Sequence, residues 1–311
     1  MSSSKKSPPP IVYIAGVIAI AAAGYAVVSN INKPGNLPTP ASNGNDLSQP
    51  NSPQQNPSGK LTFDPPTTIP AGSVLKIGGS TSMVQINQAL KIGFERKFPG
   101  VQAVPGASSS SKGLTDLAAG TIDLTGISRD LTAAETGQGL VSVPITQDKI
   151  AIVVGTANDL RTGLTADQVT KIFTGEFTNW SQVGGKDLAI RPILRPIISG
   201  THQSFQEVGL QGKKFGTGGK FKILDRDATT PLLQALGADG IGYATFSQIA
   251  NQSTVRSVAI DGNMPTASSY PYSRTLSYVY KGQPNEATKA FLGFATSADG
   301  QKLIGELAQS K

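Results

Sequence analysis

The sequence has 311 residues, with 27 Lys and Arg against 20 Asp and Glu, one His and no Cys. At roughly 100–200 residues per domain, this length predicts about two domains. The absence of Cys excludes thiol catalysis, thiolate metal sites and disulfides, and the single His202 excludes a multi-histidine zinc site. The formal net charge of +7 is mild. It argues against nucleic acid as a partner, because such proteins need clustered Lys and Arg with stacking aromatic residues.

The chain begins with an apolar leader. Lys5 and Lys6 precede an uncharged stretch at residues 11–28. Its length is at the lower limit for crossing a membrane, and the small residues at 21–26 also fit a signal-peptide cleavage site. We therefore expect residues 1–28 to be a membrane anchor or a signal segment. The positive flank stays in the cytoplasm in either case. We expect the rest of the chain to be periplasmic or extracytoplasmic, tethered to the cytoplasmic membrane by residues 11–28.

A polar tract follows the leader. Residues 29–60 consist mostly of Asn, Pro, Ser, Gln and Gly. Such a composition cannot bury enough apolar surface to offset the entropy of ordering the chain. We predict a disordered linker over residues 29–72.

From residue 74 onward, short apolar runs alternate with segments of helical periodicity. The expected strands lie at residues 74–77, 101–104, 122–127, 150–154, 190–194 and 241–244. The expected helices lie at residues 84–98, 113–119, 165–173 and 231–236, with further helix starts at residues 132–135, a capping-box pattern, and near residue 202. The run IAIVV at residues 150–154 is typical of a strand buried on both faces. This alternation predicts an α/β fold with mostly parallel sheets.

Three loops rich in small hydroxyl residues fall where a strand passes into a helix. They are residues 78–82 (GGSTS), 107–111 (ASSSS) and 195–201 (RPIISGT). Helix N-termini bind anions through unpaired N–H groups, and ligands of open α/β sheets lie at the carboxyl ends of the strands. Arg129 and Arg195 would add planar donors that match tetrahedral oxygens. The alternative is simple helix capping, the usual role of Ser or Thr before a helix. The residues alone leave both interpretations open.

Four segments resemble the periplasmic phosphate-binding proteins of ABC phosphate importers. They are residues 78–82, 110–129 (SSKGLTDLAAGTIDLTGISR), 171–185 (KIFTGEFTNWSQVGG) and 195–205 (RPIISGTHQSF), with residues 240–243 (GIGY) as a weaker fifth. The resemblance implies the two-lobed type 2 periplasmic-binding fold, with mostly parallel sheets, a two-strand hinge and a ligand cleft between the lobes. It places lobe 1 at residues 74–149 plus 254–311 and lobe 2 at residues 150–253.

The resemblance also implies a function. Members of this family bind inorganic phosphate outside the cytoplasmic membrane and deliver it to the permease and ATPase subunits of the importer. We therefore expect a monomeric binding protein and no enzyme, with no cofactor and no metal. The phosphate-binding residues that the resemblance and the loops together indicate are Ser80, Thr81, Ser82, Ser110, Ser111, Arg129, Arg195, Ser199, Gly200 and Thr201.

Two departures from the family pattern leave the ligand open. Arg129 follows a Ser where many members have an Asp, which accepts the proton of hydrogen phosphate and repels sulfate. Arg is a donor only, so the alternative is a binder of sulfate, molybdate or phosphonate. Residues 196–198 (PII) also lack the acidic residue that often pairs with the Arg of this loop.

Two further alternatives concern the role of the protein. A membrane-tethered phosphate sensor with the same fold is compatible with the leader and linker. A hydrolase is disfavoured, although Ser199 and Thr201 lie beside His202 in the sequence. The G-x-S-x-G elbow is absent, and no carboxylate lies nearby in the sequence to complete a triad.

Overall fold

The described part of the chain comprises residues 54–55, 61–63 and 69–309 of a computed structural model. All of these residues belong to one unit, Asn51–Lys311. The predicted leader at residues 1–28 lies outside the described residues, and so does most of the predicted linker. Within the described part, no helix is both long and apolar enough to cross a membrane. The short strands β1 (Gln54–Gln55) and β2 (Leu61–Thr62) pair with each other in antiparallel fashion.

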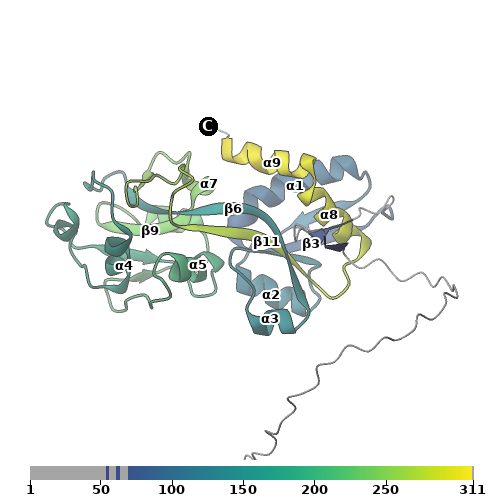
Figure 1. Cartoon of the computed structure of the whole chain (residues 1–311), viewed down its shortest axis with the longest axis horizontal. Coiled ribbons are helices and arrows are strands. Elements are labelled where there is room, and N and C mark those ends of the chain that lie inside the picture. Colours follow the sequence, from purple (N-terminus) through teal and green to yellow (C-terminus); the bar gives the residue numbers. More distant parts are fainter. Residues whose placement is uncertain (1–53, 56–60, 64–68, 310–311) are drawn as a thin grey trace, which may run out of the picture. The chain divides into compact units, whose positions relative to one another are not determined.

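Lobe 1 is a parallel sheet with helices on both faces. Its strands are β3 (Val74–Gly79), β4 (Gln102–Pro105) and β5 (Leu124–Ile127), and β3 pairs in parallel with the other two. Its helices are α1 (Val84–Lys97), α2 (Ser110–Ala118), α3 (Ala133–Gly137), α8 (Glu286–Thr296) and α9 (Ala298–Gln309). Figure 1 shows α1, α8 and α9 on one side of the sheet and α2 and α3 on the other.

The larger core of lobe 1 lies between the sheet and helices α1 and α8. Leu90 and Phe94 of α1 are both buried, and their spacing of four residues places them on one face of the helix. The ring of Phe94 packs edge-on against Phe291 of α8, with 5.2 Å between the ring centroids. A smaller apolar cluster under α2 contains Leu114 and Leu117. Both faces of the sheet are therefore covered.

Lobe 2 has the same layering. Its strands are β7 (Arg191–Leu194), β8 (Lys222–Ile223) and β9 (Gly240–Thr245), and β7 pairs in parallel with the other two. Its helical segments are α4 (Ala166–Thr174), η2 (Trp180–Val183), α5 (Gly200–Val208), α6 (Thr229–Gln234) and α7 (Phe246–Ile249). One apolar cluster contains Phe173 of α4 and Phe205 of α5, and a second contains Leu232 of α6 and Ile249 of α7.

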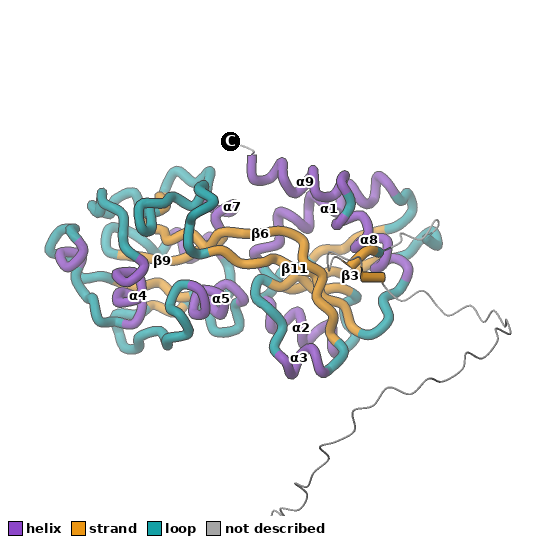
Figure 2. Tube along the Cα trace, viewed as in Figure 1, coloured by secondary structure: helices purple, strands orange, loops and turns teal. Residues whose placement is uncertain are grey.

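Two long strands connect the lobes. Strand β6 (Leu140–Gly155) pairs antiparallel with β11 (Ser273–Lys281) over residues 140–149, and with β9 over residues 150–154. Strand β10 (Val255–Ser257) also pairs antiparallel with β6. The IAIVV run is buried throughout, as the sequence predicts. Figure 2 shows β6 and β11 running side by side between the lobes.

The two-lobed α/β fold with a two-strand hinge is confirmed. The strands expected at residues 74–77 and 241–244 and the helix expected at residues 84–98 match β3, β9 and α1 to within two residues at each end. Parallel pairing holds among the strands inside each lobe. The hinge strands add antiparallel pairs, because they run alongside each other in opposite directions.

Two segments pack differently from the predicted domain boundaries. Phe63 falls in the predicted linker, yet it is buried in the core of lobe 1 and contacts Tyr280 edge-on, with 6.0 Å between the ring centroids. Tyr270 and Tyr272 lie in residues 254–311, which are predicted for lobe 1, yet they pack in the apolar cluster of lobe 2. Tyr272 contacts Phe205 there, at 5.8 Å between ring centroids. Such packing depends on distant residues and leaves no periodic pattern in the sequence.

Candidate functional site

One serine from each of the three predicted loops caps a helix. Ser80 Oγ accepts a hydrogen bond from the N–H of Ser82 at the start of η1 (Thr81–Met83). Ser109 Oγ caps α2 in the same way, and Ser199 Oγ caps α5 by accepting from the N–H of His202 at 3.3 Å. The capping interpretation is therefore correct for these side chains. It does not account for the hydroxyls of Ser82, Ser110 and Thr201, which make other contacts.

A group of buried serines closes the end of the lobe 1 sheet. Ser128, directly after β5, receives a hydrogen bond from Ser80 Oγ at 3.0 Å between the oxygens. The N–H of Ser128 donates to Ser110 Oγ at 3.2 Å, so the starts of η1 and α2 meet at this residue. Ser80, Ser110 and Ser128 are all buried. Ser128 is a member of this group that the predicted site omits, although it precedes Arg129 in the quoted motif.

The first residue of α5 fits against this group. A Cβ atom at Gly200 would lie 2.1 Å from Ser110 Oγ and 2.4 Å from Ser128 Oγ, far inside van der Waals contact. Only a glycine allows the backbone at the N-terminus of α5, in lobe 2, to approach these lobe 1 hydroxyls. The first turns of α2 and α5 thus meet, and each has N–H groups without partners inside its helix.

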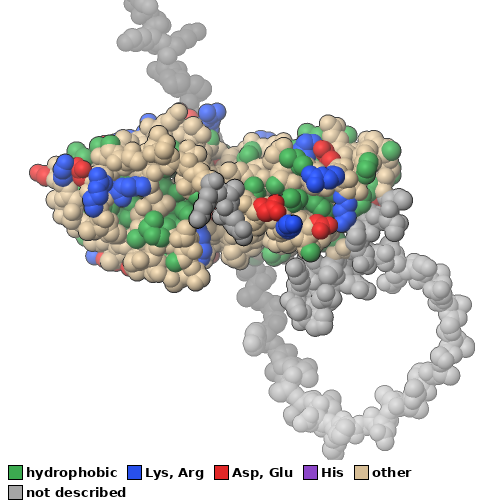
Figure 3. Space-filling model, turned by 90° about the horizontal axis from the view of Figure 1, so that it is seen from above, with side chains coloured by type: hydrophobic (Ala, Val, Ile, Leu, Met, Phe, Trp, Pro, Cys, Tyr) green, Lys and Arg blue, Asp and Glu red, His purple; other side chains and the backbone are tan. Residues whose placement is uncertain are grey.

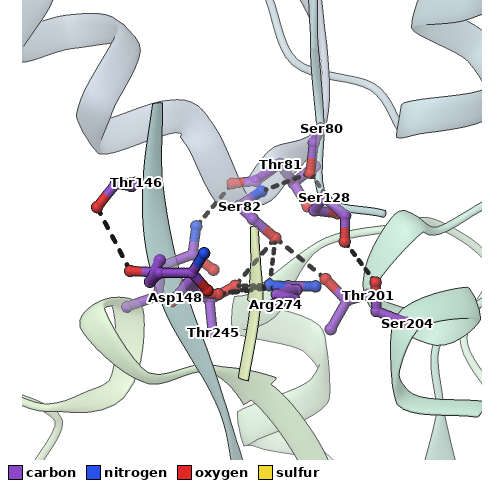
Figure 4. A network of polar contacts seen from close by, with 12 residues as sticks. Ser80, Thr81, Ser82, Ser128, Thr146, Asp148, Thr201, Ser204, Thr245 and Arg274 are labelled. Atoms are coloured by element: carbon purple, nitrogen blue, oxygen red, sulfur yellow. Dashed lines mark hydrogen bonds and ion pairs between the residues drawn. The ribbon is translucent and has the colours of Figure 1, made fainter. Parts of the chain in front are cut away.

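Hydroxyls of the two lobes also contact each other directly (Figure 4). Ser82 Oγ of lobe 1 lies 3.0 Å from Thr201 Oγ1 of α5 and accepts a hydrogen bond from Thr245 at 2.9 Å. Ser204 Oγ donates to the carbonyl of Ser128 at 2.5 Å. At the edge of the group, Gln203 Nε2 of lobe 2 donates to Ser111 Oγ at 3.3 Å. The structure thus brings together the first-loop, second-loop and third-loop residues that the sequence singles out.

Arg195 lies behind the third loop and is almost fully buried, with 1% of its surface exposed. Its Nη1 is paired with Asp227 Oδ1 at 2.7 Å, and its Nη2 donates to Thr229 Oγ1 at 2.7 Å. Its Nε has no hydrogen-bond partner among the described residues. The acidic partner missing from residues 196–198 is therefore supplied by Asp227, just before α6. No spacing rule in the sequence connects the two.

A second buried arginine, absent from the predicted site, comes from the hinge. Arg274 of β11 donates to Asp148 Oδ2 through Nε at 3.0 Å and through Nη2 at 2.8 Å. The same Nη2 lies 3.0 Å from Ser82 Oγ and 2.8 Å from Thr245 Oγ1. Burial lowers the pKa of the Arg274 guanidinium, and the Asp148 carboxylate opposes this shift. The positive charge of Arg195 lowers this pKa further, and the negative charge of Asp227 raises it.

Arg129 makes its contacts away from the hydroxyl group. Its Nη1 and Nη2 donate to the two carboxylate oxygens of Glu135, at 2.8 and 2.7 Å, and Nη1 also donates to the carbonyl of Asp130. The Arg129 guanidinium lowers the pKa of the Glu135 carboxyl to about 2. Glu135 also belongs to the capping box of α3, as the sequence predicts. Phosphate contact by Arg129 stays a prediction; its Nε is buried and has no hydrogen-bond partner among the described residues.

His202 supports the third loop through an aromatic pair. Its Nδ1 lies 3.0 Å from the hydroxyl of Tyr243, which accepts a hydrogen bond from the backbone N–H of Arg195 at 3.2 Å. Burial lowers the pKa of His202, which favours the neutral ring. The other described ring contact is with Phe215, at 4.3 Å between centroids. This arrangement positions the Arg195 backbone, and no described carboxylate is hydrogen-bonded to the imidazole.

The chemistry of the assembled group fits an oxyanion. It presents serine and threonine hydroxyls, the N-termini of two helices and two buried guanidiniums, and oxyanions accept hydrogen bonds from all of these. The described residues contain no group of three or more His, Asp or Glu side chains that could hold a metal ion. The cluster therefore favours binding of a small anion.

Comparisons with known proteins agree with this geometry. The model of a family described as the PBP superfamily domain matches residues 65–299. The phosphate-binding protein PstS of Bacillus subtilis (strain 168) is 29% identical over 243 residues, which cover 75% of this chain and 79% of that protein. The PstS of Borreliella burgdorferi is 26% identical over 253 residues, covering 75% of this chain and 88% of that protein.

Solved structures show the same likeness. A phosphate ABC transporter substrate-binding protein from Clostridium perfringens, with bound phosphate, superimposes with a TM-score of 0.68 at 30% identity, covering 76% of this chain and 98% of that one. An ABC-type phosphate transport receptor from Vibrio cholerae gives a TM-score of 0.62 at 26% identity, covering 75% and 98%. The family match extends over most of the chain and includes every residue of the site. The chain therefore belongs to the PBP superfamily.

Proposed function

We propose that this protein binds inorganic phosphate with high affinity outside the cytoplasmic membrane and delivers it to an ABC-type phosphate importer. The observation that carries the proposal is the meeting of α2 and α5 at the buried hydroxyls of Ser110 and Ser128, with Arg195 behind them. Helix N-termini and hydroxyls donate to an oxyanion, and Arg195 contributes charge. Relatives named for phosphate binding, and a similar structure with bound phosphate, support the choice of ligand.

Binding proceeds by closure of the two lobes. Ser82 and Ser110 belong to lobe 1, whereas Gly200, Thr201 and Arg195 belong to lobe 2. An anion between them contacts both lobes only when they are closed, so its higher affinity for the closed form drives closure. The closed shape is then recognised by the permease, and the ATPase subunits drive import. No covalent chemistry is involved, so the protein acts as a carrier and not as an enzyme.

Phosphate is favoured over sulfate by two buried carboxylates. Asp148 and Asp227 are paired with the two buried arginines of the site, Arg274 and Arg195 respectively. At neutral pH phosphate carries a proton that it can donate to such an acceptor, whereas sulfate has none. A carboxylate therefore attracts the protonated anion and repels sulfate. Molybdate, sulfate and phosphonate remain the alternatives that the experiment must separate.

The cellular setting is proposed from the sequence. The protein acts as a monomer in the periplasm or an equivalent extracytoplasmic space, tethered by residues 11–28, and nucleic acid is no partner. Figure 3 agrees with the last point, because Lys and Arg on the face shown are interspersed with Asp and Glu and do not form one broad basic patch. A tethered phosphate sensor is the alternative role. Loss of phosphate uptake on deletion of the gene would favour the importer over the sensor.

Calorimetry on the full chain tests the proposal. The protein is unfolded and refolded to remove bound ligand, then titrated with phosphate alone and again in excess sulfate near pH 8. Tight phosphate binding that sulfate leaves unchanged is the expected result. Competition by sulfate would replace phosphate by a broader class of oxyanions. Absence of binding by either anion would overturn the function.

A further inference from the structure

Arg274 occupies a central position in the polar network. It lies directly opposite Asp148 in the antiparallel register of hinge strands β11 and β6. Figure 4 shows its guanidinium between Asp148 and Thr201, below Ser82. Only 6% of its surface is exposed. A charged side chain buried at the junction of both lobes and the hinge loses its hydration. It therefore needs more hydrogen bonds and nearby opposite charge than a surface ion pair does.

The hydrogen bonds of Arg274 do not use all of its donors. Asp148 receives Nε and Nη2, and Nη2 is shared further with Ser82 and Thr245. Nη1 is buried and has no partner among the described residues. A guanidinium has five N–H donors, and leaving one unsatisfied in the interior is costly. The ion pair with Asp148 therefore leaves Nη1 of Arg274 without a hydrogen-bond acceptor.

Three hydroxyls around Arg274 can also donate hydrogen bonds. Ser82 Oγ, Thr201 Oγ1 and Thr245 Oγ1 come from lobe 1 and from two separate elements of lobe 2. Ser82 bonds to the other two hydroxyls, and Arg274 donates to Ser82 and Thr245. An oxyanion has only acceptors to offer at its charged oxygens, so it suits a set made of donors.

We infer that Arg274 is a second cationic ligand of the bound anion, contributed by the hinge and not by either lobe. This inference rests on the proposed function. The anion takes Nη donors of Arg274 together with the hydroxyls of Ser82 and Thr245, while Asp148 keeps Nε. Because β11 passes between the lobes, this contact does not depend on lobe closure, whereas the contact between Ser82 and Thr201 does. The hinge thus takes part in binding.

A double variant tests the inference. Arg274→Gln with Asp148→Asn removes both charges and leaves neutral groups that can bond to each other, so no unpaired charge remains in the interior. The matched control is Arg191→Gln with Asp239→Asn, which removes a similar two-bond ion pair of lobe 2 away from the hinge. Calorimetric phosphate titration of the full chain should show a Kd raised about 10- to 150-fold in the first variant, the range for losing a hydrogen bond to a charged group. The control should stay within about threefold.

The outcomes distinguish failure of the proposed function from failure of the role of Arg274. A wild-type chain that fails to bind phosphate overturns the proposed function. Tight binding by wild type, control and the Arg274 double variant alike overturns only the role of Arg274. Arg274→Lys keeps Asp148 and therefore separates the role of Arg274 from that of the carboxylate; it also decides if circular dichroism shows that the double variant is unfolded. Lys keeps the charge but cannot donate to Asp148 and to an anion together in forked geometry, so the phosphate Kd should rise while circular dichroism shows a folded chain. An unchanged Kd in this variant overturns the inference.

Discussion

The side-chain amide of Gln248 joins the two lobes by donating a hydrogen bond to the backbone carbonyl of Thr81, at 2.6 Å between Nε2 and O. Its Oε1 accepts from Thr229 Oγ1 at 2.6 Å, and Thr229 in turn accepts from Arg195 Nη2 at 2.7 Å. A continuous chain of hydrogen bonds therefore links the buried arginine of lobe 2 to the first loop of lobe 1. Thr81, Thr229 and Gln248 also line a cavity of about 720 Å³ that borders the site.

Gln248→Ala should weaken the closed form. The variant loses the bond to Thr81 and leaves Thr229 with one partner fewer, so phosphate affinity should fall about threefold to tenfold, the effect of one neutral hydrogen bond. The loss should appear in the dissociation rate, because the bond forms only when the lobes are closed. Stopped-flow release of phosphate measures it. Gln252→Ala is the control, since Gln252 lines the same cavity and makes no side-chain hydrogen bond to lobe 1 among the described residues. Equal release rates for the two variants would contradict this role.

Gly200→Ala should prevent closure while each lobe remains folded. The new Cβ would lie 2.1 Å from Ser110 Oγ and 2.4 Å from Ser128 Oγ, across the boundary between the lobes. The lobes can avoid this clash by staying apart, so we expect phosphate binding to be lost with a nearly unchanged melting temperature. Gly137→Ala in α3 meets no atom within 4 Å and serves as the control. Small-angle scattering with saturating phosphate would show compaction in the control only; compaction in both variants would refute the argument.

The loops of the site could be predicted because their signal is local. A Ser or Thr between an apolar run and a helical period marks a helix start, and the carboxyl ends of parallel strands meet at one edge of a sheet. Ser82 and Thr201 are 119 residues apart in sequence, yet this rule brings them into one group, and the structure places their oxygens 3.0 Å apart.

The charged half of the site could not be predicted in the same way. Arg274 lies in a run, SRTLSYVYK, that shows no feature beyond strand composition. Its pairing with Asp148, 126 residues away, depends on the register of β11 against β6, which only tertiary structure determines. Asp227 meets Arg195 for a similar reason, because the segment before α6 returns to the end of β7. Sequence composition reveals which residues can bond, but not which distant partners they reach.

Removal of the Arg195 charge should abolish high-affinity binding. Arg195→Ala alone would leave the buried Asp227 uncompensated and risk unfolding, so the informative variant is Arg195→Gln with Asp227→Asn. Loss of the Arg195 charge and of its charge-assisted hydrogen bonding to the anion should raise the phosphate Kd about 100-fold. Calorimetry near pH 8 measures the change. The Arg191→Gln and Asp239→Asn variant again provides the control, and near-wild-type binding by the Arg195 variant would show that the site has been placed wrongly.

The ion pair between Arg129 and Glu135 should make stability depend on acid pH. Arg129 lowers the pKa of Glu135 from 4.5 to about 2 in the folded state. The unfolded chain therefore binds the proton first as the pH falls. The stabilisation is fully present above pH 4.5 and is lost as the pH approaches 2. The pair is partly exposed to solvent, so its contribution near neutral pH is about 1–2 kcal/mol after screening.

Glu135→Gln isolates this contribution. At neutral pH the variant should unfold at lower denaturant concentration than wild type. The difference should shrink steadily as the pH falls from 4.5 through about 2, below which Glu135 is protonated in both states. Glu176→Gln is the control, because Glu176 carries a hydrogen bond from Thr174 but no ion pair of the described set. A difference between wild type and the Glu135 variant that persists unchanged at pH 2 would mean that the hydrogen bonds of the α3 capping box, and not the charge of Arg129, stabilise this helix start.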